Sequence, residues 1–193
     1  LLFAMVAVFL ICAGGQAIND VFDAEIDSKI NKDKPIPSGK IKKTTALYFS
    51  ILLFIVGIMY AALINTQALI ISIIFSILLI LYAAVLYKTK YVGNIVVALG
   101  TAFTFIFGAA SAGNISLLII VFAISAFFAN MSREITKDFE DIKKDAGFKK
   151  TLPMISKKLA KGFVISYHLL AIVFSLIAFF VFMPTNFVYL III

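Results

Sequence analysis

Four long stretches without a single charged residue constrain this chain more than any other feature of its sequence. They cover residues 1–19, 44–87, 91–132 and 162–193. A helix needs about 20 consecutive apolar residues to cross the hydrocarbon core of a membrane. The first stretch therefore has room for one membrane-spanning helix. The second and third have room for two each, and the fourth holds one helix and the start of another.

The three longer stretches each contain a short polar break where the chain would turn back. The breaks lie at residues 65–67, 113–116 and 184–186 and contain asparagine, glycine or proline, which favour turns. The apolar runs do not alternate every second residue, so helices are favoured over the strands of a membrane barrel. We predict an all-α, polytopic transmembrane helix bundle of about seven helices that forms one domain over residues 1–193. The expected spans are 1–19, 44–64, 67–87, 92–112, 115–134 and 160–183, with a seventh that starts at residue 187.

The charged residues are confined to the segments 20–43, 88–90 and 133–161. Predicted helical hairpins separate these segments, so all three would lie on one side of the membrane. All 17 Lys and Arg residues would then share that side, and the positive-inside rule places it in the cytoplasm. With 63% hydrophobic and 14% charged residues, the chain is far more apolar than soluble domains. Despite a net charge of +7, we expect a cell-membrane protein that has membrane lipids, and no nucleic acid, among its partners.

The ten acidic residues are divided equally between two of the charged segments, and both contain the pattern D-x-x-D-x-x-x-D. The pattern is formed by Asp20, Asp23 and Asp27 in the first segment and by Asp138, Asp141 and Asp145 in the second. Separations of three, four and seven residues place side chains on one face of a helix. We therefore expect each cluster to prolong the end of a membrane helix, near 1–19 and 115–134, by two or three polar turns.

A cluster of three carboxylates on one helical face indicates a bound cation. Like charges repel there, and reduced hydration near a bilayer increases the penalty. Oxygen ligands without histidine or cysteine favour Mg²⁺, which commonly binds one or two carboxylates together with phosphate oxygens. Two such clusters therefore suggest a diphosphate held between metal ions, with cationic side chains nearby to contact phosphate. The ordinary alternative is a solvated face of acids and lysines, but two copies of the pattern on one membrane side favour the metal site.

At these residues the sequence resembles the UbiA superfamily of intramembrane prenyltransferases. The family signature N-D-x-x-D-x-x-x-D is matched from Asn19 to Asp27, and its basic-P-L-P-S-G segment corresponds to residues 34–39. Further matches are the second aspartate motif at 138–145 and the middle-loop residues Tyr87, Lys88 and Asn94. The resemblance implies nine transmembrane helices, with the motifs after the second and the sixth. On that basis we expect the first helix and most of the last two to lie beyond this chain.

Within the superfamily, residues 133–138 and 150–153 are most similar to archaeal digeranylgeranylglyceryl phosphate synthases. This similarity implies Mg²⁺-dependent transfer of a geranylgeranyl group from its diphosphate to the hydroxyl of geranylgeranylglyceryl phosphate, in membrane ether-lipid biosynthesis. A UbiA-type prenyltransferase for an aromatic acceptor is the main alternative, and a divalent-cation transporter is a remote one. A CDP-alcohol phosphotransferase is disfavoured because its motif has glycine where Ala24 follows Asp23. The oligomeric state is left open.

The resemblance also implies roles for individual residues. The metal ligands would be Asn19, Asp20, Asp23, Asp27, Asp138, Asp141 and Asp145. Of these, Asp23, Asp27, Asp141 and Asp145 would be catalytic. The isoprenyl diphosphate and the lipid-like acceptor would be bound by Lys34, Tyr87, Lys88, Lys90, Asn94, Arg133 and Lys137.

Other residues are assigned to the apolar part of the bundle. Candidates for a dry wall around an allylic cation are Phe103, Phe105, Phe107, Phe127 and Phe128, although packing is the commoner role for any one ring. For His168, inside an apolar run, hydrogen-bonded packing is favoured over catalysis. Gly57 and Gly108 fit close contacts between helices.

Overall fold

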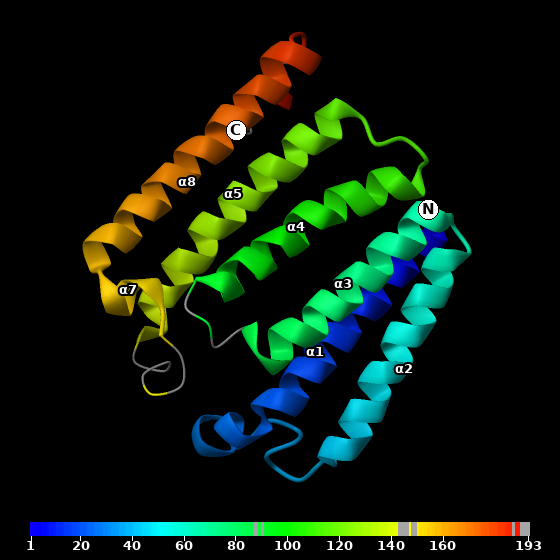
Figure 1. Cartoon of the computed structure of the whole chain (residues 1–193), viewed down its shortest axis with the longest axis vertical. Helices are drawn as coiled ribbons and strands as arrows, with labels where there is room; N and C mark the ends of the chain where they lie inside the picture. Colours follow the sequence, from blue (N-terminus) through cyan, green and yellow to red (C-terminus); the bar gives the residue numbers. More distant parts are fainter. Residues whose placement is uncertain (87–88, 90, 143–146, 148–149, 187, 190–193) are drawn as a thin grey trace. The chain divides into compact units, whose positions relative to one another are not determined.

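The structure is a computed structural model, and it describes all residues except 87–88, 90, 143–146, 148–149, 187 and 190–193. All regular elements in the described part are helical (Figure 1). Six helices are long and apolar enough to cross a membrane, which confirms the predicted all-α, multi-pass fold. The seventh span, predicted to start at residue 187, falls mostly outside the described residues.

The chain divides into two compact units, Leu1–Leu86 and Tyr87–Ile193. The first unit contains α1 (Leu2–Ile30), α2 (Lys43–Ala62) and α3 (Thr66–Ala84), each packed against the other two. Its core is formed by Ile11 and Ile18 of α1, Phe54 of α2 and Ala83 of α3. This packing buries one side of α1, and the same side of the helix continues to the first acidic motif.

The second unit is arranged around α5 (Leu117–Glu140), which lies between α4 (Val92–Ser111) and α8 (Lys157–Ile177) (Figure 1). A π-helical turn, η2 (Ala178–Phe182), continues α8. The four-residue helix α7 (Leu152–Ile155) precedes α8 and has proline in its first turn. Sequence analysis missed α7, because so short a helix has no hydrophobic period to detect.

Polar side chains start three of the membrane helices. Asn65, Ser116 and Ser156 each accept a hydrogen bond from a backbone N–H in the first turn of α3, α5 and α8 respectively. Such N-caps satisfy donors that the helix itself leaves unpaired. The first two caps lie within the breaks predicted from the sequence, so these breaks do separate consecutive helices.

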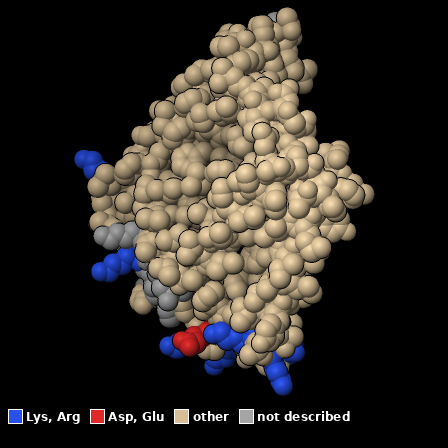
Figure 2. All heavy atoms as spheres, turned by 45° about the vertical axis from the view of Figure 1, so that its right-hand side comes forward, with Lys and Arg blue, Asp and Glu red and all other residues tan. Residues whose placement is uncertain are grey.

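The charged residues lie at helix ends and in loops. On the face drawn in Figure 2, uncharged residues cover most of the surface; blue side chains lie at its left and lower margins, and red ones at the lower margin. Helix α1 continues without interruption from its apolar part through Asp27 to Ile30, and α5 continues through Asp138 to Glu140. This confirms that the first acidic cluster prolongs a membrane helix; in the second, α5 carries Asp138 and ends before Asp141, and Asp145 lies outside the described residues.

Helices α1 and α2 approach each other closely at Gly57. A Cβ atom added there would lie 2.8 Å from Ile11 Cγ1 and 3.3 Å from the backbone oxygen of Ala7. The close contact predicted at Gly57 is therefore confirmed. The one predicted at Gly108 is wrong, since a Cβ there would meet no described atom within 4 Å.

The two glycines make a matched pair for testing helix packing. Gly57→Ala is expected to lower the free energy of unfolding by about 1–3 kcal/mol, because the added methyl overpacks the α1–α2 contact. Gly108→Ala should leave it unchanged or raise it by about 0.5–1 kcal/mol, through better helix propensity. Thermal unfolding in detergent, followed by circular dichroism, measures both. Equal losses in the two variants would contradict the packing seen at Gly57.

Candidate active site

The first acidic motif lies on the last three turns of α1. The buried side of this helix runs along its length through Ile11 and Ile18 and ends at Asp27, which is 4% exposed. Asp20 and Asp23 are only partly buried. The packing of α1 therefore places the three carboxylates in different environments, although their spacing puts them near one face.

Asn19 and Asp23 form one pair within the motif. The Asn19 Nδ2 amide donates a hydrogen bond of 3.2 Å to Asp23 Oδ2, one helical turn further on. This contact follows from the spacing of four residues, which brings side chains together on a helix. It places an amide and a carboxylate side by side, two oxygen-bearing groups of the kind that hard cations bind.

Asp20 and Asp27 form a second pair, joined by Lys34 from the loop after α1. Lys34 Nζ donates to Asp20 Oδ1 at 3.1 Å and to Asp27 Oδ2 at 2.7 Å. Asn31 Nδ2 donates to the other carboxylate oxygen of Asp27 at 3.1 Å. The sequence assigned Lys34 to phosphate binding, but it could not show that two aspartates of the motif hold its ammonium group.

These contacts change the acidity of Lys34. Burial by itself lowers the pKa of Lys34, but the hydrogen bonds and charges of Asp27 and Asp20 outweigh burial and raise it above its usual value of 10.5. The ammonium is therefore charged at neutral pH. Its stabilising contribution is present below the pKa of the unfolded chain and is lost as the pH rises through the higher folded value.

The loop that carries Lys34 is a compact turn. The Ser38 N–H donates to the Lys34 carbonyl at 2.9 Å, and the Ile41 N–H donates to the Pro35 carbonyl at 3.0 Å. Gly39 has a φ of +78°, a left-handed conformation that glycine adopts without strain. The Pro-Ile-Pro-Ser-Gly segment thus folds back on itself and holds the backbone of Lys34 beside α1.

The second acidic motif begins with a buried pair between α4 and α5. Asn94 Nδ2 donates to Asp138 Oδ2 at 2.8 Å, and the two residues are 8% and 4% exposed. Asp141 is partly exposed and caps α5, with its N–H donating to the Lys137 carbonyl at 3.0 Å. The structure thus brings together two residues predicted separately, one as a substrate contact and one as a metal ligand.

Two other cationic residues predicted for the site, Arg133 and Lys137, are exposed. Arg133 pairs with the nearly buried Glu134 at 2.9 Å, a carboxylate that sequence analysis did not select. The remaining predicted site residues, Tyr87, Lys88, Lys90 and Asp145, lie outside the described residues.

The side chains that are present fit a hard cation by their chemistry. Within the described ranges, no three His, Cys, Asp or Glu side chains converge into a ready-made metal cage. Mg²⁺ seldom uses such a cage, because it keeps several waters and takes one or two carboxylates with substrate phosphates. The oxygen-rich pairs Asn19–Asp23 and Asn94–Asp138 suit that mode of binding.

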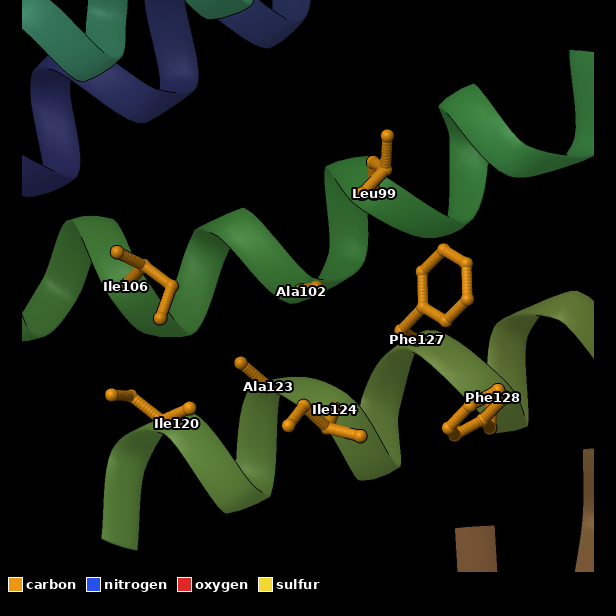
Figure 3. A pocket seen from close by; sticks show the side chains of 8 residues that line it. All are labelled: Leu99, Ala102, Ile106, Ile120, Ala123, Ile124, Phe127 and Phe128. Carbon is orange, nitrogen blue, oxygen red and sulfur yellow. The ribbon is translucent and has the colours of Figure 1, made fainter. Parts of the chain in front are cut away.

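An apolar cavity of about 340 Å³ lies between α4 and α5 (Figure 3). It is lined by Leu99, Ala102, Ile106, Ile120, Ala123, Ile124, Phe127 and Phe128, with no polar side chain. Of the five rings proposed for a dry wall, Phe127 and Phe128 line this cavity. Phe107 is buried in packing, and Phe105 stacks on Phe122 at 6.4 Å between ring centroids.

The polar groups between α5 and α8 are structural. The Ser132 hydroxyl lies 2.9 Å from the Val164 carbonyl, to which it donates, and 2.7 Å from His168 Nδ1. The prediction that His168 takes part in hydrogen-bonded packing agrees with this geometry.

Comparison with known sequences places these features in a family. The sequence profile of the UbiA prenyltransferase family matches residues 1–193. A digeranylgeranylglyceryl phosphate synthase from Methanococcus maripaludis is 44% identical over 146 residues, which are 75% of this chain and 51% of that protein. The enzyme of the same name from Thermococcus gammatolerans is 36% identical over 176 residues, covering 89% of this chain and 63% of that protein. The chain therefore spans between half and two thirds of the length of these relatives.

Two solved structures have the same fold. One, described as digeranylgeranylglyceryl phosphate synthase, superposes with a TM-score of 0.82 at 33% identity, over 94% of this chain and 65% of the other. The second is a UbiA homolog from Archaeoglobus fulgidus bound to GPP and Mg²⁺. Its TM-score is 0.83 at 20% identity, over 99% of this chain and 72% of the other.

Proposed function

Because this chain belongs to the UbiA prenyltransferase family, we propose that it transfers a prenyl group from an isoprenyl diphosphate to the hydroxyl of a lipid acceptor. In the finer form of this proposal the donor is geranylgeranyl diphosphate, the acceptor is geranylgeranylglyceryl phosphate and the product is an ether lipid. Relatives named for that synthesis, 36–44% identical to this chain, support the finer form. The proposal concerns the whole protein, of which this chain carries both aspartate motifs.

The observation that carries the proposal is the division of the α4–α5 pair into a polar end and an apolar groove. Asn94 and Asp138 meet near one end of the two helices. The cavity begins at Leu99, five residues further along α4, and contains no polar side chain. A prenyl diphosphate has the same division, with an anionic head that needs cations and oxygen ligands and a hydrocarbon tail that needs a dry cavity.

The head of the donor would be held through Mg²⁺. We assign the ligands to Asn19 and Asp23 of the first motif and to Asp138, Asp141 and Asp145 of the second. When bound, Mg²⁺ acts as a Lewis acid that stabilises the negative charge of the departing diphosphate. Cationic contacts to phosphate oxygens would come from Lys34, Lys88, Lys90, Arg133 and Lys137.

The transfer exchanges one carbon–oxygen bond for another. The bond between C1 of the prenyl group and the diphosphate oxygen breaks, and its electron pair leaves with the diphosphate. The acceptor hydroxyl oxygen forms the new bond to C1 and releases its proton. Water would also react with the electron-poor C1, so an apolar lining such as that of the α4–α5 cavity favours the acceptor. The faces of Phe127 and Phe128 would attract the positive charge through cation–π interaction.

We propose that the ends of α1 and α5 that carry the acids face the cytoplasm of a cell membrane. The basis is the positive-inside rule, since every Lys and Arg lies in the segments 20–43, 88–90 and 133–161, which the predicted helical hairpins place on one side of the membrane. A divalent-cation transporter would instead need its acids near the middle of broken spans. Here the acids of α1 and α5 occupy the last turns, which favours an interfacial enzyme site.

The acceptor is tested by product formation. Purified protein is given labelled geranylgeranyl diphosphate with either geranylgeranylglyceryl phosphate or 4-hydroxybenzoate, each with and without Mg²⁺. We expect labelled product only with the lipid acceptor and only with the metal. Product with the aromatic acceptor alone would replace the lipid assignment with a quinone-pathway one. No product with either acceptor would remove both.

A further inference from the structure

The first acidic motif consists of two pairs of side chains with different partners. Asn19 is bonded to Asp23, whereas Asp20 and Asp27 are both bonded to Lys34. At 3.6 residues per turn, the centres of the two pairs lie roughly 70° apart around α1. The sequence spacing suggests a single row of carboxylates, but on the helix the two pairs of side chains lie in two neighbouring rows.

Asp27 is poorly placed to bind a hydrated metal ion. Both of its carboxylate oxygens accept hydrogen bonds, one from the Lys34 ammonium and one from the Asn31 amide. Mg²⁺ would need to come within about 2.1 Å of one of these oxygens while retaining waters. The Lys34 ammonium already occupies that position at 2.7 Å and supplies the neutralising charge.

We propose that Asp27, together with Asp20, holds Lys34 as a fixed cation beside the metal-binding pair Asn19–Asp23, so that Asp27 is a positioning residue and not a metal ligand. An ammonium group has three donors, and in the described part of the chain two of them are given to these carboxylates. The third would point a positive charge at a phosphate oxygen. That last step rests on the proposed function, whereas the assignment of Asp27 to Lys34 does not.

The compact loop after α1 gives this arrangement its rigidity. Hydrogen bonds at both ends of the Pro35–Gly39 turn hold the backbone that carries Lys34. The carboxylates hold the other end of the side chain, so that little freedom remains in a residue that is otherwise long and flexible. The aspartate motif and the Lys-Pro-Ile-Pro-Ser-Gly segment thus act as one structural unit, with Asp27 as the link.

Two double variants with the same net charge test the assignment. Asp27→Asn with Lys34→Met removes the partly buried ion pair, and Asp23→Asn with Lys34→Met removes one carboxylate of the metal-binding pair. Mn²⁺ binding to each purified protein is followed by electron paramagnetic resonance. We expect affinity within about threefold of wild type for the first variant and a loss of at least about tenfold for the second. A tenfold loss in the first would make Asp27 a ligand and overturn the proposal, as would a wild type that binds no Mn²⁺.

A second measurement separates positioning from general damage to the fold. Lys34→Met, Asp27→Asn and their combination should raise the KM for the diphosphate donor by similar factors, with little added by the second change, because residues acting through one contact are not additive. Lys34→Arg should restore most of the affinity. Additive losses would overturn the proposal. If Asp27→Asn with Lys34→Met fails to fold, the single variants Asp27→Asn and Asp23→Asn, which also share one net charge, give the same Mn²⁺ comparison. The expected Mn²⁺ pattern without turnover on any acceptor would refute the proposed function alone.

Discussion

Replacing Asp23 or Asp141 by alanine is expected to lower kcat by at least about a thousandfold. Each change removes an oxygen ligand proposed to hold Mg²⁺ on the leaving diphosphate, and stabilisation of that charge by a metal is worth several kcal/mol. The two residues belong to different motifs, one on α1 and one at the end of α5. Losses of similar size would therefore show that both motifs serve one reaction.

Two nearby acids provide the matched controls. Glu25 on α1 and Glu140 at the end of α5 are exposed and lie outside the aspartate patterns. Glu25→Ala and Glu140→Ala should retain nearly wild-type kcat, measured with labelled donor at saturating Mg²⁺. Near-normal turnover in either Asp23→Ala or Asp141→Ala would contradict the two-motif scheme.

Removal of divalent cations is expected to abolish turnover while leaving the helices intact. A chelator would take away the ion that neutralises the diphosphate, and the carboxylate and amide oxygens of the motifs, being electron-pair donors, cannot replace its Lewis acidity. Added Mg²⁺ or Mn²⁺ should restore the rate. Ca²⁺ should restore it poorly, because it prefers more ligands at 2.3–2.6 Å than the about 2.1 Å of Mg²⁺.

The control for this experiment is the fold itself. The described helices are held by apolar packing, as at Ile11, Phe54 and Met131, so helical circular dichroism should not change on chelation. Loss of the helical signal together with activity would indicate that the metal is structural. Full turnover in metal-free buffer would contradict a Mg²⁺-dependent reaction.

Much of the fold was predictable because a membrane leaves few possible structures for a long apolar segment. Uncharged runs of about 20 residues have few alternatives to a spanning helix. For that reason the six spans, the turns near Asn65 and Ser116 and the polar extension of α1 all follow from the sequence. The short α7 and the misjudged Gly108 show the limit, since neither depends on hydropathy and both depend on local packing.

The candidate site was predictable as a set of residues and only partly as an arrangement. The spacing of Asp20, Asp23 and Asp27 gives their common face on a helix, but it does not show which of them the neighbouring loop will cover. The same holds for Asp138, whose partner Asn94 lies on another helix 44 residues away. Contacts of this kind depend on the paths of loops and the depths of helix packing, which periodicity does not encode.

The amino-acid sequence by itself determined that this chain is a helical membrane protein with two aspartate motifs at helix ends. The lengths of the apolar runs and the positions of the charged residues along the chain do not depend on how its helices are arranged. Only the tertiary structure decided that Lys34 joins Asp20 to Asp27, that Asn94 pairs with Asp138 and that α4 and α5 line an open apolar cavity. These features exist only where separate segments meet, and each depends on packing distances that sequence spacing alone does not specify.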